Sequence, residues 1–237
     1  MEMSEAAAIQ APTVKGALFP RLGSVLALAP LGVWTVWHMW ENLYAWAGED
    51  AWARRVTNVT VEGNTPRYIG NPVSSALVSF VVFAPLIIHV LWGLRRLKFT
   101  GVNAQQYSYF GNFKYLLQRL SALGLLGFIG AHVFLARISP ALNNAETGHE
   151  SFTDLAAHMR HHPPTLIVYI LGVLGTAYHL ANGVYTSAFI NGLAASPKAQ
   201  RRMSAASIVF FLLLLGIGWG AVAGLWTAGV NYPPPLD

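Results

Sequence analysis

The chain has 237 residues, of which 54% are hydrophobic and only 11% are charged, and its formal net charge is +5. Soluble domains carry about 25% charged residues, so this composition excludes an ordinary soluble protein and indicates an integral membrane protein. Because the chain contains no cysteine, disulfides, thiolate-bound iron–sulfur clusters, c-type haem attachment and a cysteine nucleophile are all excluded. Any electron-transfer cofactor must therefore be held by histidine.

Five apolar segments follow one another along the chain. Each is long enough to cross a bilayer core as a helix, which takes about 20 residues. They cover approximately residues 21–46, 72–94, 115–138, 165–189 and 204–228. We find no sequence repeat and no soluble domain, so the prediction is a single all-α membrane domain over residues 1–237 with five transmembrane helices.

The first two spans carry local signals besides their length. Aromatic residues gather at the far end of the first span, in the sequence WTVWHMWENLYAW, as at a membrane–water interface. In the second span Pro85 removes a backbone donor, and we expect a kink close to His89. The connection between these spans, residues 48–72, is rich in Thr, Asn, Gly and Pro and is predicted to be a polar loop.

Two later connections are also informative. Residues 94–114 are basic and aromatic, which indicates a segment at the membrane interface. Residues 139–164 are expected to include a short surface helix. They contain four histidines: His149, His158, His161 and His162. Asp154, His158 and His162 would share one face of that helix. Solvated histidines are the favoured interpretation over a zinc site, and a role in proton delivery stays open.

Lysine and arginine are distributed unequally between the two sides of the membrane. The N-terminal arm and the loops after the second and fourth spans hold ten of the fifteen, including every lysine. The positive-inside rule therefore places the N-terminus in the cytoplasm and the C-terminus outside. Because Glu2 and Glu5 stand where a signal peptide would be basic, we expect no cleaved signal. The expected location is the inner (cytoplasmic) membrane of a prokaryote.

Each of the first four spans contains one histidine. His38 and His132 come late in outward-running spans, whereas His89 and His179 come late in inward-running spans. The topology thus predicts an outer pair, His38 with His132, and an inner pair, His89 with His179. A single intramembrane histidine is often merely bonded to a neighbouring hydroxyl, but four that sort by depth indicate function.

Pairs of histidines suit a haem better than a zinc ion. Zinc usually takes four protein ligands, or three plus water, whereas a haem asks the protein for two axial ligands. We therefore predict a helical bundle enclosing two stacked, bis-histidine b-type haems. Glycines near the ligands could leave room for the macrocycles, although a single glycine is more typical of helix packing. These glycines are Gly93, Gly127, Gly130, Gly172 and Gly175.

This arrangement resembles the dihaem cytochrome b membrane anchor of succinate:quinone oxidoreductases, the family of succinate dehydrogenase and fumarate reductase. The resemblance rests on the spacing of the four histidines and covers almost the whole chain. It implies a flavoprotein subunit and an iron–sulfur subunit bound on the cytoplasmic face. It also implies that His89 and His179 bind the proximal haem and His38 and His132 the distal one. Membrane lipid is a further expected partner, and nucleic acid is not.

The resemblance further implies a quinone site, with menaquinone favoured, on the outer side near the distal haem. Glu41 and Glu62 are candidates for quinone proton transfer, although each is also plausible as a solvated acid. Some relatives place an acid two residues before the fourth-span ligand, where this chain has Ala177. Four arginines are candidate partners for haem propionates, although most such residues only anchor the topology: Arg137 outside and Arg95, Arg96 and Arg119 inside.

Two other functions compete with this interpretation. One is a stand-alone transmembrane reductase with two haems, and the other is a metal or haem transporter that uses membrane histidines. Transporters tend to have broken helices in related halves, and the sequence shows none.

Overall fold

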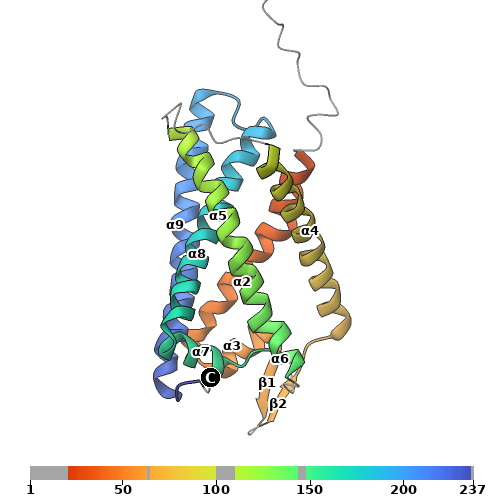
Figure 1. The fold of residues 1–237 in the computed structure, drawn as a ribbon, viewed down its shortest axis with the longest axis vertical. Helices are drawn as coiled ribbons and strands as arrows, with labels where there is room; N and C mark the ends of the chain where they lie inside the picture. Colours follow the sequence, from red (N-terminus) through yellow and green to blue (C-terminus); the bar gives the residue numbers. More distant parts are fainter. Residues whose placement is uncertain (1–20, 63–64, 100–109, 144–147, 236–237) are drawn as a thin grey trace, which may run out of the picture.

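The computed structural model describes residues 21–62, 65–99, 110–143 and 148–235, and its fold is a bundle of long helices (Figure 1). Within these described ranges five helices are long and apolar enough to cross a membrane, which confirms the predicted all-α membrane protein. These spans are Arg21–Ala47, Pro72–Lys98, Gly111–Leu142, Pro163–Ile190 and Pro197–Asn231.

The first span changes its helical type three times along its length, beginning as an α-helix over residues 21–26. A π-helix, η1 (Ala27–Gly32), contains Pro30 and leads into α2 (Val33–Asn42). Proline has no N–H to donate and its ring crowds the preceding turn, so a wider turn accommodates it. A 3₁₀ segment, η2 (Leu43–Ala47), ends the span at Gly48, whose φ of +96° favours glycine. α2 presents His38 between these two irregular turns.

The other four spans are more regular. α4 (Pro72–Phe99) continues through Pro85, and α5 (Phe110–Val133) is extended by a π-helix, η4 (Phe134–Ile138), and by α6 (Ser139–Leu142). α8 (Pro163–Ile190) and α9 (Pro197–Ala228) follow, and a 3₁₀ turn, η5 (Gly229–Asn231), ends the last span. α9 begins seven residues before the predicted boundary at residue 204. Ser196 Oγ accepts the Ala199 N–H at 3.2 Å, and Pro197 takes the first turn, so the polar residues after them are also helical.

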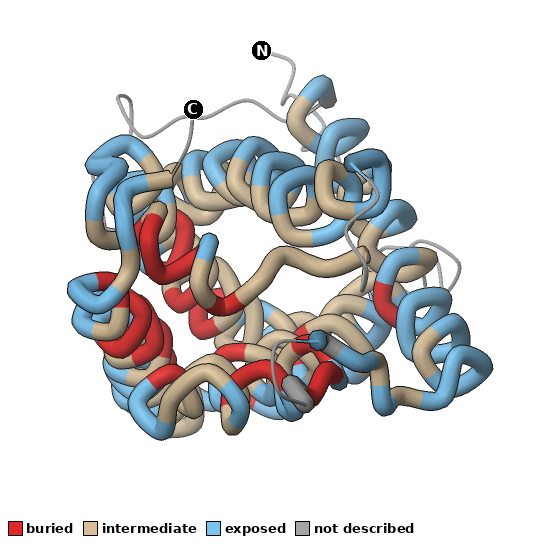
Figure 2. The backbone as a smooth tube through the Cα atoms, turned by 90° about the horizontal axis from the view of Figure 1, so that it is seen from below, coloured by how far each residue is buried: buried red, intermediate tan, exposed pale blue. Residues whose placement is uncertain are grey.

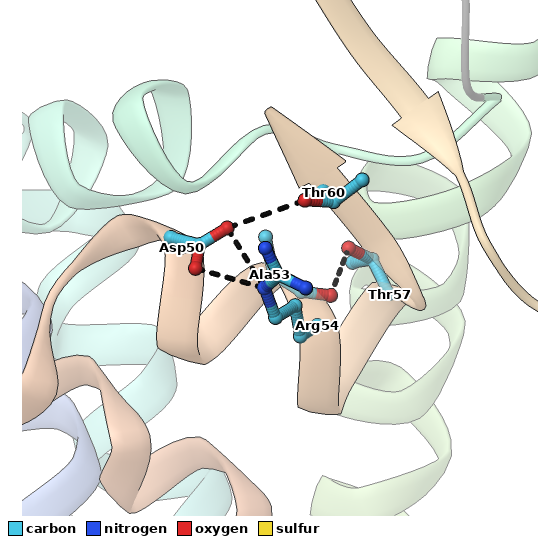
Figure 3. A network of polar contacts seen from close by, with 5 residues as sticks. All are labelled: Asp50, Ala53, Arg54, Thr57 and Thr60. Carbon is cyan, nitrogen blue, oxygen red and sulfur yellow. Dashed lines mark hydrogen bonds and ion pairs between the residues drawn. The ribbon is translucent and has the colours of Figure 1, made fainter. Parts of the chain in front are cut away.

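The predicted polar loop at residues 48–72 is in fact folded, which corrects the sequence-based expectation. It contains α3 (Glu49–Trp52), a π-helix η3 (Ala53–Thr57) and an antiparallel hairpin of β1 (Val59–Glu62) and β2 (Thr65–Tyr68). Both oxygens of Asp50 accept the Arg54 Nε–H, at 2.9 and 2.8 Å, and Thr60 Oγ1 lies 3.5 Å from Asp50 Oδ1 (Figure 3). This network joins the exposed Asp50–Arg54 pair of α3 and η3 to the buried Thr60 of β1, and the Thr57 hydroxyl donates to Ala53 O at 2.9 Å inside η3. Turn-rich composition concealed these elements, because they are stabilised by contacts with the rest of the protein.

The connection between the third and fourth spans contains α7 (Phe152–His161), as the sequence predicted. Ser151 Oγ accepts the Asp154 N–H at 3.0 Å and caps the helix. One face of α7 is buried against the ends of α8 and α9, through Phe152, Leu155 and Met159. α3, α6, α7 and the hairpin therefore lie together at one end of the bundle (Figure 1). Of the predicted interfacial segment, residues 94–114, the two ends belong to α4 and α5, and residues 100–109 lie outside the described residues.

Burial is unequal among the spans. In the most apolar 18-residue stretch of the last span 33% of the residues are buried, compared with 0% in the third span. α9 is therefore the central helix of the core. Figure 2 shows most of the buried positions gathered toward one side of the bundle. Glycine allows the close packing there: a Cβ at Gly218 would lie 2.5 Å from Val173 and 2.6 Å from Met39. The remaining apolar surface of the spans is suited to lipid.

Candidate functional site

The inner histidine pair is brought together from α4 and α8. The ring centroids of His89 and His179 are 6.1 Å apart, with an angle of 79° between their planes. Burial is partial for both side chains. The two residues are 90 positions apart in the sequence, and α4 and α8 run in the same direction, so the same depth in the membrane follows from the topology.

A polar group from α5 orients the inner ligand. Ser121 Oγ donates to Gln118 O at 3.0 Å and lies 3.2 Å from His179 Nδ1. The hydroxyl hydrogen is thus engaged elsewhere, and the oxygen can accept a hydrogen bond from Nδ1–H. Gln118 Nε2 is also 3.2 Å from Nδ1 and donates to His179 O at 3.2 Å, while Asn182 Nδ2 donates to Gln118 Oε1 at 2.8 Å. With Nδ1 protonated, Nε2 is left as the electron-pair donor.

The outer pair comes from α2 and α5. The ring centroids of His38 and His132 are 6.0 Å apart, with an angle of 60° between the planes. Tyr169 OH lies 3.1 Å from His132 Nδ1, so this ring has a partner of the same kind as His179. The His38 ring stacks on Trp34 at 4.7 Å, with only 7° between the planes.

His38 is held from its own helix as well. Asn42 Nδ2 donates to His38 O at 2.8 Å and lies 3.5 Å from His38 Nε2, at the limit of a hydrogen bond. Trp52 Nε1 donates to Asn42 Oδ1 at 3.1 Å, which fixes the orientation of this amide. Trp52 is buried in α3, so the folded connection after the first span supports the outer pair directly.

The two ring pairs fit axial coordination of an iron. An imidazole nitrogen lies roughly 2 Å from a bound metal, so two rings on opposite sides of one ion have centroids roughly 6 Å apart. The observed 6.0 and 6.1 Å agree with that spacing. Among the described residues no group of three or more His, Asp or Glu side chains converges as a metal site, which disfavours zinc. A donor set of two neutral imidazoles is what a b-type haem needs.

Comparison with known proteins agrees with this chemistry. Over 206 residues the chain is 32% identical to the succinate dehydrogenase cytochrome b558 subunit of Bacillus subtilis (strain 168), an alignment that covers 86% of this chain and 94% of that protein. Residues 103–219 match the family described as succinate dehydrogenase/fumarate reductase transmembrane subunit. The chain belongs to this family. It is a transmembrane cytochrome b of the succinate:quinone oxidoreductases, and it takes part in electron transport.

The glycines of this cytochrome b have two different surroundings. A Cβ at Gly172 would collide with the Phe128 ring, so this glycine allows α8 to pack against α5. A Cβ at Gly93, Gly127 or Gly130 would meet nothing within 4 Å, and one at Gly175 would make only an ordinary contact with Leu125 at 3.9 Å. Gly172 is therefore filled by packing, whereas the space beside the other four is compatible with the role predicted for them.

The loop histidines are engaged in local contacts. His158 Nδ1 lies 2.8 Å from Asp154 O, and His162 Nδ1 lies 2.8 Å from Thr165 Oγ1. His161 Nε2 lies 3.0 Å from Tyr232 O. These contacts cap and tether α7 to its neighbours.

The surroundings of His149 and Glu150 change their protonation. Arg137 Nη1 donates to Gly148 O at 2.8 Å and lies 2.6 Å from His149 Nε2. Burial and the Arg137 charge lower the pKa of His149 to about 4, so this ring is neutral and accepts from Arg137. Burial raises the pKa of Glu150 to about 7; Asp154 raises it further and His158 opposes the rise. A pKa near 7 leaves the Glu150 carboxyl partly protonated at neutral pH, a property that no sequence motif indicates.

The two acids predicted to handle quinone protons lie in different elements. Glu41 is in α2 and is partly exposed, close enough to Arg55 for their charges to interact. Glu62 ends β1, opposite Thr65 of β2. Both elements lie on the side of the outer histidine pair, because α2 carries His38 and β1 follows the same span.

Sequence reasoning missed the residues that orient the ligands. Tyr169, Ser121 and Gln118 approach the histidines from other helices, so no local spacing reveals them. The position of Asn42 could have been predicted from the sequence, because it follows His38 by four residues and therefore lies on the same helix face. A polar side chain inside an apolar span needs a partner, and that rule alone would have drawn attention to all four.

Proposed function

We propose that this chain carries electrons between a cytoplasmic iron–sulfur subunit and membrane quinone through two bis-histidine b-haems. When bound, each haem supplies a one-electron carrier. The observation that supports the proposal is the presence of two histidine ring pairs with centroids 6.0 and 6.1 Å apart in a cytochrome b of the succinate:quinone oxidoreductase family.

The chain's own residues have distinct tasks in this scheme. His89 and His179 hold the inner haem, and Ser121 keeps the Nδ1 proton of His179 in place. His38 and His132 hold the outer haem, with Tyr169 and Asn42 as their supports. The contacts at Nδ1 of His179 and His132 would fix the ring tautomer and orientation, as such partners do at other metal sites, and Asn42 anchors the backbone at His38.

The partners follow from the family and the charge distribution. A flavoprotein and an iron–sulfur subunit bind at the face opposite α7, where Lys198, Arg201 and Arg202 are exposed at the start of α9. Electrons then enter at the inner pair. Quinone, with menaquinone favoured, reacts near the outer pair in the cytoplasmic membrane of a bacterium.

The first expected outcome is a stoichiometry of two non-covalent haems b per chain in the intact complex. Two ligand pairs are available, and without cysteine no covalent attachment can form. Pyridine haemochrome analysis against quantified protein measures this ratio. A value of one, or none, would rule out the dihaem scheme and leave room for a different use of the membrane histidines.

Glu41 and Glu62 are proposed to exchange protons with quinone. If either does, its glutamine variant should lower quinone turnover by about 100-fold or more, the range of lost acid–base assistance. The measurement is quinone-linked activity at a confirmed content of two haems. Asp50→Asn in α3 provides a nearby control, because that carboxyl lies in the Arg54 network. Unchanged turnover in both glutamine variants would remove these acids from the mechanism.

Tyr169→Phe should raise the reduction potential of one haem and leave the other unchanged. His132 Nδ1–H loses its acceptor in this variant, so the ring becomes a poorer donor and favours the ferric state less. One net hydrogen bond of about 1 kcal/mol corresponds to roughly 40 mV for a one-electron couple, given 59 mV per tenfold change. A redox titration of the visible spectrum measures both potentials. Ser121→Ala is the matched variant and should move only the other haem; a shift of the same haem by both would contradict the two-pair assignment.

A further inference from the structure

A groove runs between α8 and α9 at the end of the bundle that carries α7. It has a volume of about 370 Å³, and every residue that lines it is apolar or aromatic: Leu166, Ile170, Trp219, Val222, Ala223 and Trp226. Both helices are transmembrane spans. The groove therefore opens toward the surrounding lipid and not toward water.

The two tryptophans give the groove its length and its fixed walls. Trp219 and Trp226 are seven residues apart in α9, or about 10 Å along a helix axis. Trp219 Nε1 donates to Ile170 O at 3.1 Å, which holds that indole across the inner part of the groove. Both indoles remain substantially exposed, at 40% and 41%. A slot of this length and character accommodates several methylene groups of an acyl chain.

A cation lies at the outer end of the groove. The Arg160 guanidinium, in the last turn of α7, sits over the Trp226 ring with its central carbon 4.0 Å from the ring centroid. α7 reaches this position because Gly229 at the end of α9 has no Cβ, which would otherwise collide with Ala156 O and the Arg160 side chain. Within the part of the chain that the structure describes, no carboxylate is within ion-pair distance of Arg160.

We propose that this groove binds one acyl chain of an anionic phospholipid, with the lipid phosphate on the Arg160 guanidinium. The planar guanidinium of arginine presents several N–H donors that match phosphate oxygens in pairs. Stacking on Trp226 holds the Arg160 guanidinium in one orientation. The apolar slot runs inward from the charge, as an acyl chain runs inward from its headgroup. A neutral quinone ring would leave the guanidinium without a counter-charge, which favours a lipid as the occupant. The proposal does not depend on the haems or on the membrane orientation.

The test is native mass spectrometry of the purified complex after incubation with dioleoyl phosphatidylglycerol or dioleoyl phosphatidylcholine. The wild-type protein should retain phosphatidylglycerol preferentially. Arg160→Gln should lower its retention about tenfold, the ratio given by one hydrogen bond to a charged group at the low end of its range. Arg160→Lys should retain an intermediate amount of phosphatidylglycerol, because the positive charge remains but the paired N–H donors of the guanidinium are lost. Arg54→Gln, which removes an arginine of the same end of the bundle, is the matched control and should bind as the wild type does.

Two results would overturn the proposal. One is the absence of a charge-dependent preference, seen either as equal retention of phosphatidylglycerol by the wild-type and Arg160→Gln proteins or as equal retention of the two lipids by the wild type. The other is a loss of extractable quinone from Arg160→Gln while its bound lipid is unchanged, which would assign the groove to a quinone tail. If Arg160→Gln fails to assemble, Ala223→Phe fills the groove from α9 and should reduce retention of phosphatidylglycerol while Arg160 is intact.

Discussion

His132→Ala is expected to abolish electron transfer to quinone while leaving succinate oxidation by an artificial dye nearly intact. The ring centroids of His132 and His38 are 6.0 Å apart, so in our proposal this substitution removes a ligand of the outer haem only. The flavoprotein and iron–sulfur subunits bind at the opposite face in our proposal, and dye reduction does not use the outer half of the bundle. Quinone-linked turnover should fall by at least about tenfold, or about 1.4 kcal/mol in the barrier.

The measurement compares two activities in one preparation. Succinate-dependent reduction of a soluble dye reports the peripheral subunits, and succinate-dependent quinone reduction reports the complete path. His161→Gln is the matched control, because this exposed histidine lies in α7 and contacts only Tyr232 O among its described hydrogen bonds. Normal quinone activity in an assembled His132→Ala complex that lacks the outer haem would place the quinone beside the inner pair.

The second large effect is a loss of haem that follows the depth of the substituted histidine. His89→Ala and His179→Ala should each remove the same haem, because their rings face one another 6.1 Å apart. His38→Ala should remove the other. Partners in one site act as a unit, so the double variant of His89 and His179 should lose no more haem than either single variant.

Low-temperature difference spectra distinguish the two haems if their absorption bands differ, and redox titration distinguishes them by potential. The pairing would be wrong if the component lost in His89→Ala matched that lost in His38→Ala. It would also be wrong if the double variant of His89 and His179 lost both haems while each single variant lost one. Retained assembly, judged by co-purification of the peripheral subunits, is the condition under which these spectra are compared.

Segment length and helix direction, read from the sequence, were sufficient to predict the five spans and to predict which histidines lie at the same depth. A run of about 20 apolar residues must satisfy its backbone internally, and only a helix does this in lipid. Helices joined by short connections alternate in direction, so a histidine late in the first span and one late in the third lie on the same side. That argument uses only spacing and direction, and the structure brings the rings of His38 and His132 together.

Tertiary packing decided the features that depend on several segments at once. The hairpin of β1 and β2 was mistaken for a loop, since its alternation is short and its stability comes from contacts such as those around Asp50. Gly172 was assigned a place beside a macrocycle, but Phe128 from another helix occupies the space next to it.

The partners of the ligands were also beyond local reading. Tyr169 reaches His132 from 37 positions away and Ser121 reaches His179 from 58. A hydrogen bond between two transmembrane helices depends on how each is rotated about its axis, and rotation is set by packing against every neighbour. The sequence by itself therefore determined the depth of each histidine, whereas only the tertiary structure decided which hydroxyl and which amide lie beside it.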